Sequence, residues 1–416
     1  MDRETFVYVA LGDHNRLVGR LWTRVRRGRE SATFQYDDGW LDDPERFALE
    51  PALSLGPGAH HTGANRAIFG ALGDSAPDRW GRALMGRAER RAAREEERAP
   101  SALTELDYLL RVSDRSRQGA LRFKSEPDGE FLGHAERDEV PPLIELPRLL
   151  AASDRLLDEE DDALLALLLA PGSSLGGARP KASVADMDGQ LAIAKFPKGD
   201  DDIDIVRWEA VALTLAVRSG IDTSQWRLET IDGRSVLVLR RFDRDSDRRV
   251  PYVSAMSMLG ATDGDQRSYL EIADVLRQHG SSSESDRQAL WRRIVFSILI
   301  SNTDDHLRNH GFLYDGNTGW RLSPAFDLNP VPADVKPRFL STAVDLDDNE
   351  ASIDLALSVA AHFALNGDAA RAIARDVARS VSDWRRVAAD LGIPSGATER
   401  MSSAFEHDDL RTALNF

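Results

Sequence analysis

Short runs of β-branched and aromatic residues mark the beginning of the chain. They lie at 5–11, 17–22 and 31–36, and turn-prone Gly, Asp and Asn separate them. Such runs are typical of β-strands joined by tight turns. The sequence therefore predicts a small β-rich N-terminal unit.

The pattern then becomes helical. Residues 79–98 and 146–170 contain few helix breakers and many Ala, Arg or Glu residues, which favours helices. Glutamates interleave with the arginines of 87–98, and this mixture predicts a solvated helix. The Gly/Ser-rich segment 171–181 interrupts the pattern and predicts a loop.

Strand and helix patterns alternate after this loop. Strand composition occurs at 191–196 and 236–242. Between them, apolar residues recur at helical spacing over 205–219, and Gly220 is expected to end that helix. From about Tyr252 onward the pattern is mainly helical. These patterns predict an α+β fold with a mixed middle part and a helical last part.

The length favours two or three packed units, because 416 residues exceed the usual size of a single domain. We predict domains at 1–125, 126–245 and 246–416, namely a β-rich N-terminal domain with a helical extension, a mixed lobe and an α-helical lobe. The last quarter keeps a helical period through 373–384.

The richest candidate chemistry follows the apolar helix predicted at 290–299. The polar segment 301–310 separates Asp304 from Asn309 by four residues, which is the separation of the Asp and Asn in the catalytic loop of protein kinases. In that loop the Asp accepts the proton of the substrate hydroxyl and the Asn binds Mg²⁺. The spacing predicts these roles for Asp304 and Asn309.

A second carboxylate follows 18 positions after Asn309. Asp327 stands among Pro, Phe and Leu in the segment 323–330, where a buried charge needs a cation or a polar partner. Mg²⁺ takes a few oxygen ligands together with phosphate, so Asn309 and Asp327 with a nucleotide would form a complete set. A helix cap or a turn would explain Asp327 equally well if it stood alone.

Two further charged residues fit nucleotide binding. Lys195 lies in the strand LAIAKF, which is similar to the Val-Ala-Ile-Lys strand of kinases, and Glu209 on the next helix could pair with it. The glycines of 171–181 would let backbone N–H groups approach phosphate, although the segment matches no standard phosphate-loop pattern.

Composition narrows the class of protein. The net charge of −16 argues against unaided binding of DNA or RNA. The sequence contains no cysteine, no signal peptide and no stretch long enough to span a bilayer, so we expect a cytoplasmic protein.

These residues resemble the HipA kinase family. Segment 174–181 (SLGGARPK) is similar to the family's glycine loop, and 303–309 (TDDHLRN) to its catalytic segment. Segment 322–328 (LSPAFDL) resembles its metal-binding segment, and 241–244 (RFDR) its hinge motif. In the N-terminal third, residues 34–36 (FQY) and 77–81 (PDRWG) resemble the N-terminal domain of HipA.

The resemblance implies a serine/threonine protein kinase that uses ATP and Mg²⁺, with a protein-kinase-like fold. Asp304 would be the catalytic base, Asn309 and Asp327 the metal ligands, and Glu209 the partner that positions Lys195. The residues expected to contact the nucleotide are Gly176, Gly177, Ala178, Arg179, Pro180, Lys181, Lys195, Arg240, Arg241, Phe242, His306, Asn309 and Asp327.

The resemblance also implies regulation and partners. Ser174 occupies the position at which family members phosphorylate themselves and become inactive, and Ser173 is a possible competitor. A small helix-turn-helix antitoxin of the HipB type would carry the protein to operator DNA. The substrate would be a cellular protein, for example a translation factor such as an aminoacyl-tRNA synthetase. Asp305 stands where many relatives have glycine.

Three alternatives remain open from the residues. The same nucleotide machinery could phosphorylate a small molecule or a lipid, or a degenerate kinase fold could serve only to bind a transcriptional regulator. A metal-dependent hydrolase could use Asp304, Asp305, His306 and His310, but the glutamate of H-E-x-x-H is missing because position 307 is leucine.

Overall fold

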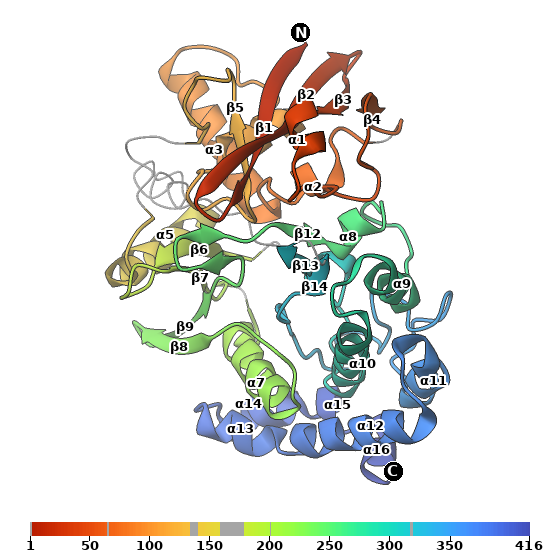
Figure 1. The fold of residues 1–416 in the computed structure, drawn as a ribbon. Coiled ribbons are helices and arrows are strands. Elements are labelled where there is room, and N and C mark those ends of the chain that lie inside the picture. Colours follow the sequence, from red (N-terminus) through yellow and green to blue (C-terminus); the bar gives the residue numbers. More distant parts are fainter. Residues whose placement is uncertain (1, 65, 134–139, 159–178, 200, 317–318) are drawn as a thin grey trace. The chain divides into compact units, whose positions relative to one another are not determined.

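A computed structural model of the chain describes residues 2–64, 66–133, 140–158, 179–199, 201–316 and 319–416. The chain forms two compact units, and Figure 1 labels most of their elements. Unit 1 comprises Met1–Gly199 and Glu229–Val253, and unit 2 comprises Asp200–Leu228 and Ser254–Phe416. The predicted domain boundaries at 125 and 245 stay predictions, since unit 1 contains the first predicted domain and most of the second.

Unit 1 carries most of the strands. Its elements are β1 (Arg3–Leu11), β2 (His14–Arg26), β3 (Arg29–Tyr36), α1 (Asp38–Asp42), β4 (Ala59–His61), α2 (Gly70–Gly73), α3 (Arg79–Glu95), α4 (Glu105–Arg111), β5 (Leu121–Lys124), η1 (Leu143–Glu145), α5 (Leu146–Asp158), β6 (Lys181–Ala185), β7 (Leu191–Lys195), β9 (Arg234–Arg240), β10 (Arg244–Asp245) and β11 (Arg248–Arg249). The chain passes between the units within β8 (Trp226–Ile231) and β12 (Tyr252–Ser254).

The first sheet confirms the predicted β-rich N-terminal unit. Its strand order is β4-β3-β2-β1-β5, and neighbouring strands are antiparallel. Alternate residues of β1 and β3, such as Val7, Val9 and Phe34, are fully buried, so the sheet packs its inward face on a core. The prediction rested on the runs of β-branched and aromatic residues that form these strands.

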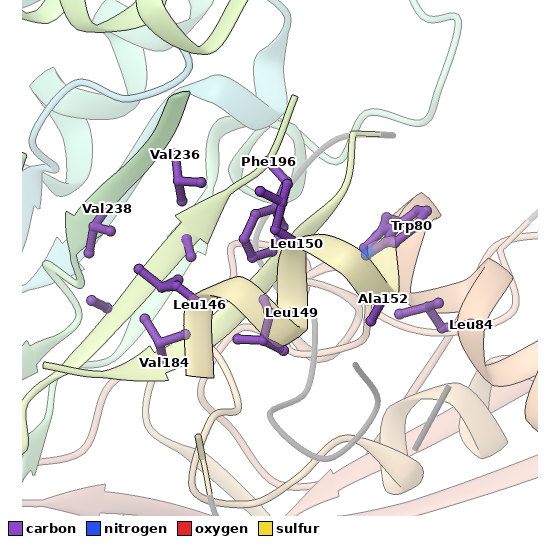
Figure 2. Close-up of a cluster of buried hydrophobic side chains, with 13 residues drawn as sticks. Trp80, Leu84, Leu146, Leu149, Leu150, Ala152, Val184, Phe196, Val236 and Val238 are labelled. Atoms are coloured by element: carbon purple, nitrogen blue, oxygen red, sulfur yellow. The ribbon is translucent and has the colours of Figure 1, made fainter. Parts of the chain in front are cut away.

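The second sheet has the order β6-β7-β9-β8 and carries Lys195 at the end of β7. Antiparallel pairing places Lys195 opposite Lys181 of β6 and opposite Leu237 of β9. Helix α5 packs on this sheet, and Figure 2 shows Leu146, Leu149 and Leu150 of this helix against strand residues. Residues of α3 join the same apolar cluster.

Unit 2 is mainly helical, as predicted for the last part of the chain. Its elements are α7 (Ile205–Arg218), α8 (Ala255–Met258), α9 (Tyr269–His279), α10 (Ser283–Leu299), η2 (Leu307–Asn309), β13 (Gly311–Tyr314), β14 (Trp320–Leu322), α11 (Ile353–Ser358), η4 (Ala360–Phe363), α12 (Gly367–Ser382), α13 (Trp384–Asp390), α14 (Ser395–Arg400), α15 (Ser402–Phe405) and α16 (Asp408–Leu414).

Two sequence predictions need correction. The helical period expected through 373–384 is divided, because α12 ends at Ser382 and α13 begins at Trp384. Glu89 of α3 does not lie on a solvated face, since it is 5% exposed and its carboxylate pairs with Arg98 and Arg111. In the part of the chain that the structure describes, no helix has the length and apolar character needed to cross a membrane.

Candidate active site

The catalytic segment of unit 2 lies between α10 and β13. Asp304 is exposed, and its backbone carbonyl accepts hydrogen bonds from the backbone N–H of His306 (2.9 Å) and from Nδ2 of Asn309 (3.1 Å). The loop therefore holds Asp304 and Asn309 together through its own backbone. Because the amide nitrogen of Asn309 is used in this way, its side-chain oxygen is the atom suited to bind a cation.

Asp305 forms the buried centre of this segment. Its carboxylate accepts hydrogen bonds from the hydroxyl of Tyr269 on α9 and from Ser297 Oγ on α10 (3.0 Å), and Nε2 of His310 lies 3.0 Å from Oδ1. Burial would raise the pKa of Asp305, but the neighbouring His310 and the hydrogen bonds from Tyr269 and Ser297 outweigh it and lower the pKa. The charged carboxylate thus ties two helices to the segment.

A second segment supports the catalytic loop from residues that carry no recognisable motif. The carbonyl of Thr303 accepts hydrogen bonds from Lys336 Nζ (3.1 Å) and Ser341 Oγ (2.9 Å), and the carbonyl of Asp305 accepts one from Thr342 Oγ1 (2.8 Å). Sequence reasoning missed all three donors. No local pattern marks them, because each acts across about 35 residues of chain.

Asp327 lies on a segment that is attached to the catalytic loop. Asn302 Oδ1 accepts a hydrogen bond from the N–H of Asn329 (3.3 Å), and the N–H of Val331 donates to the carbonyl of Ser301 (3.2 Å). Asp327 itself is half-buried and has a left-handed backbone with φ +55. Non-glycine residues in this region are uncommon and concentrate at functional sites.

Helix α10 also fixes the start of the Asp327 segment. Nη2 of Arg293 donates to the carbonyl of Ser323 at 2.5 Å. Burial lowers the pKa of Arg293 to about 10 although Asp222, Asp305 and Asp286 oppose this shift, so the group stays charged at neutral pH. One buried arginine therefore links the helix before the catalytic segment to the predicted metal segment.

The residues of unit 1 that were predicted to contact the nucleotide differ from one another in burial and in their partners. Lys195 is half-buried at the end of β7. Nζ of Lys181 lies 2.9 Å from Oδ2 of Asp78, and both side chains are 4% exposed. A phosphate contact by Lys181 would therefore compete with Asp78. Arg179 is half-buried and Pro180 is buried at the start of β6.

The predicted hinge is held by the N-terminal part of unit 1. Arg241 donates to Asp243 and to the carbonyls of Ser116 and Arg117. Its side chain is 0% exposed, so a contact between Arg241 and adenine would have to come from its backbone. The hinge neighbours Arg240 and Phe242 are half-buried, and the ring of Phe242 lies 6.0 Å from that of Tyr252.

Asp243 is the buried acceptor of the hinge. Burial would raise its pKa, but the charges of Arg241 and Arg244 and a hydrogen bond from the N–H of Gly119 (2.7 Å) hold the pKa below its ordinary range. Gly119 has φ +72, and a Cβ there would lie 3.2 Å from the backbone nitrogen of Tyr252. This close approach explains the glycine.

Several predicted residues cannot be placed together. Ser173, Ser174, Gly176, Gly177 and Ala178 lie outside the described residues. Glu209 is buried on α7 in unit 2, whereas Lys195 belongs to unit 1, so their ion pair stays a prediction.

The hydrolase alternative loses its geometric basis. His306 precedes the short helix η2 and His310 follows it, so the two imidazoles do not share a helical face. His310 is buried against Asp305, and among the described residues no group of three His, Cys, Asp or Glu side chains could hold a metal. His306 is half-buried, and its Nδ1 has no hydrogen-bond partner within the described part of the chain.

Comparison with known proteins identifies the fold and the family of this chain. The chain resembles HipA of Shewanella oneidensis, solved in complex with HipB and operator DNA, with a TM-score of 0.65, 17% identity and coverage of 98% of this chain and 96% of that one. The fold is therefore the mixed α+β HipA kinase-like fold, as predicted. The model of the HipA-like C-terminal domain family matches residues 173–385, so the chain belongs to the HipA-like family.

Two curated relatives agree with this assignment. The chain is 25% identical over 352 residues to "Putative kinase Y4mE" of Sinorhizobium fredii, covering 78% of this chain and 77% of the relative. It is 32% identical over 108 residues to "Putative kinase" of Haemophilus influenzae, covering 23% and 32%. The resemblance to HipA drawn from the motifs is thus confirmed at the level of the family.

Proposed function

We propose that this protein is a serine/threonine protein kinase that uses ATP and Mg²⁺, with Asp304 as the catalytic base. The observation that carries the proposal is the hydrogen bond from Asn309 to the carbonyl of Asp304, which holds the proposed base and the proposed metal ligand in one loop. Family membership supports ATP as the phosphate donor.

Asp304 suits its proposed role because it is exposed while its neighbours Thr303 and Asp305 are buried. The carboxylate would accept the proton of a serine or threonine hydroxyl as the hydroxyl oxygen attacks the γ-phosphorus, and the bond to ADP would break. The products would be ADP, the phosphoprotein and the transferred proton. The contacts of Asp305, Lys336, Ser341 and Thr342 would orient the loop for this step.

The residues present fit Mg²⁺. Asn309 offers a side-chain oxygen, and Asp327 is a half-buried carboxylate on an attached segment. Mg²⁺ is usually held by one or two protein oxygens together with phosphates and water, so a larger cluster of acidic ligands is not required. When bound, the ion would neutralise charge that develops on the phosphates.

The Asp304→Asn variant tests the proposal. A neutral amide cannot accept the proton, so phosphotransfer should fall by about 10²–10⁴-fold while ATP binding is retained. Asp327→Asn should weaken binding of ATP in the presence of Mg²⁺. Asp347→Asn is the matched control, because Asp347 is an exposed aspartate of unit 2 that takes no part in the proposed site. Normal turnover by both site variants would exclude the assignment.

Two alternatives become outcomes of the same assay. Transfer of phosphate to a lipid or small molecule, with none to protein, would make the chain a small-molecule kinase. Absence of any transfer by the wild-type protein, together with binding of a transcriptional regulator, would indicate a non-catalytic binding protein. The HipA structure in complex with HipB and operator DNA supports a helix-turn-helix antitoxin as a partner of this chain.

A further inference from the structure

One arginine joins helix α16 of unit 2 to the catalytic segment, residues 301–310. Nη1 of Arg338 lies 2.6 Å from Oδ2 of Asp409 in the first turn of α16. Nε of Arg338 donates to Oγ of Ser301 at 3.1 Å, and Nη2 donates to the carbonyl of Ile298 at 3.0 Å. Each nitrogen of this guanidinium therefore bonds a different part of unit 2.

The surroundings of Arg338 suit a guanidinium. Ile298 lies in the last turn of α10, where carbonyls lack a partner within the helix and a cation is favoured. The side chains of Arg338 and Asp409 are only 20% and 16% exposed, so water screens this ion pair less than one on the surface. A guanidinium offers its donors in fixed directions, which an ammonium group cannot do.

Ser301 is the residue at which this contact meets the catalytic segment. It is fully buried and has a left-handed backbone with φ +53, which is uncommon for a residue other than glycine. Its Oγ accepts from Arg338 and donates to the carbonyl of Ala404 on α15 at 2.8 Å. These contacts hold an otherwise unfavourable conformation, and so fix the direction in which the chain leaves α10.

His407, the residue before α16, makes a second contact with the end of α10. Its Nε2 lies 3.2 Å from the carbonyl of Leu299, and its Nδ1 accepts from the N–H of Leu410 at 3.4 Å. Both bonds require a neutral ring with its hydrogen on Nε2. Burial lowers the pKa of His407 to about 4, so the ring is neutral at pH 7.

Arg338 also lies within a segment that bonds the catalytic loop at other points. This segment, residues 336–342, donates to the carbonyls of Thr303 and Asp305. These two residues flank Asp304. The ion pair with α16 therefore anchors the same segment that holds the backbone on both sides of Asp304.

We infer that Arg338 is a positioning residue for the proposed catalytic base Asp304, and that α16 holds Arg338 in place through Asp409. The three bonds of Arg338 set the start of the catalytic segment relative to the end of α10. This inference rests on the proposed kinase function. It gives α16 a role in phosphotransfer although this helix supplies no group to the reaction.

The test measures the rate of label transfer from γ-labelled ATP to proteins of a cell lysate at saturating ATP, and the Kd for ATP with Mg²⁺ by calorimetry. Both are measured at a temperature at which circular dichroism shows each variant to be folded. Asp409→Asn keeps an oxygen for the N–H of Ile353, which donates to Oδ1 of Asp409 at 2.8 Å, but removes the charge beside Arg338.

Asp409→Asn should lower the rate about ten-fold, with the Kd for ATP within three-fold of wild type. A small misplacement of a catalytic group slows the reaction, whereas the proposed nucleotide contacts of unit 1 are unchanged. Arg338→Lys should cause a similar loss of rate, because it keeps the charge but not the three directed donors.

Asp408→Asn is the matched control. Asp408 is the adjacent aspartate in the first turn of α16, its side chain is 93% exposed, and it pairs with Arg411 of the same helix. This variant should keep the wild-type rate. If Arg338→Lys fails to fold, Asp409→Asn decides against this control alone.

Three results would overturn the inference. The first is a wild-type rate in Asp409→Asn and Arg338→Lys while Asp304→Asn is inactive, which would leave the proposed function intact. The second is an equal loss of rate in Asp408→Asn. The third is a loss of ATP affinity as large as the loss of rate, which would make the role of Arg338 purely structural. A wild-type rate in Asp304→Asn would instead contradict the proposed function.

Discussion

At the scale of single residues, the buried carboxylate of Asp305 holds the catalytic segment, residues 301–310, through contacts with three side chains. Tyr269, Ser297 and His310 all meet its buried carboxylate. Its neighbour Asp304 is exposed, so one of these adjacent aspartates supports the segment and the other is the proposed catalytic base.

Asp305→Asn should therefore destabilise the fold. The loss at pH 7 should be about 3 kcal/mol, because removal of one charge leaves its buried partners unmatched. The pKa of Asp305 is lowered from 3.8, so the stability that its charge contributes is present above about pH 4 and is lost as the pH falls through the folded pKa. Urea unfolding at pH 7 and at pH 3 measures this difference. Equal stability of variant and wild type at pH 7 would contradict the role of the network.

Residue types and their spacing point to the proposed chemistry but not to the contacts that support it. The spacing of Asp304 and Asn309 is local, and the loop hydrogen bond between them is equally local. Tyr269 lies 36 positions from Asp305, and Asp78 lies 103 positions from Lys181. No periodicity or spacing encodes such pairs, because they are created only when the elements pack.

At the scale of elements, helix α5 packs on the second sheet and buries apolar residues of its strands. Leu149 is 0% exposed on the face of α5 that meets the sheet, whereas Ile144 in the preceding turn is 82% exposed. Figure 2 shows Leu149 within the apolar cluster. Both residues are aliphatic and lie five positions apart, so they form a matched pair.

Leu149→Ala should lower the free energy of unfolding by about 2–5 kcal/mol because it leaves a cavity in this cluster. Ile144→Ala should change it by less than about 0.5 kcal/mol. Thermal unfolding of the two variants gives the comparison. Similar small losses in both would mean that α5 does not pack on the sheet as described.

Elements were predictable where hydrophobic periodicity was strong. Residues 205–219 and 290–299 correspond to α7 and to the end of α10, and 191–196 corresponds to β7. The division between α12 and α13 was not predictable from period, because apolar residues keep their helical spacing across Asp383. Glu89 of α3 was misjudged for a similar reason, since Arg98 and Arg111 lie beyond the helix that carries it.

At the scale of the whole molecule, the chain carries a net charge of −16, and phosphorylation of one of its serines would make this charge more negative. We predict that Ser174 becomes phosphorylated when the protein is incubated with ATP and Mg²⁺, and that this abolishes activity. A phosphate adds about −1.5 to −2 charge near pH 7 to a segment proposed to bind nucleotide phosphates, so ATP affinity should fall.

Mass spectrometry of the ATP-treated protein locates the modified serine. Asp304→Asn serves as the unmodified control, and Ser174→Ala should remain active. Phosphorylation of Ser173 alone would move the site by one residue. An unmodified Ser174 in a protein with robust kinase activity, or unchanged ATP affinity after its modification, would contradict self-inactivation.

The most direct test of the kinase proposal is phosphoamino acid analysis after incubation with γ-labelled ATP, Mg²⁺ and cell lysate. Wild-type protein should transfer label to serine or threonine of a protein, and Asp304→Asn should reduce this transfer by at least 10²-fold. Absence of protein-bound label with the wild type, or equal labelling by Asp304→Asn, would contradict the assignment.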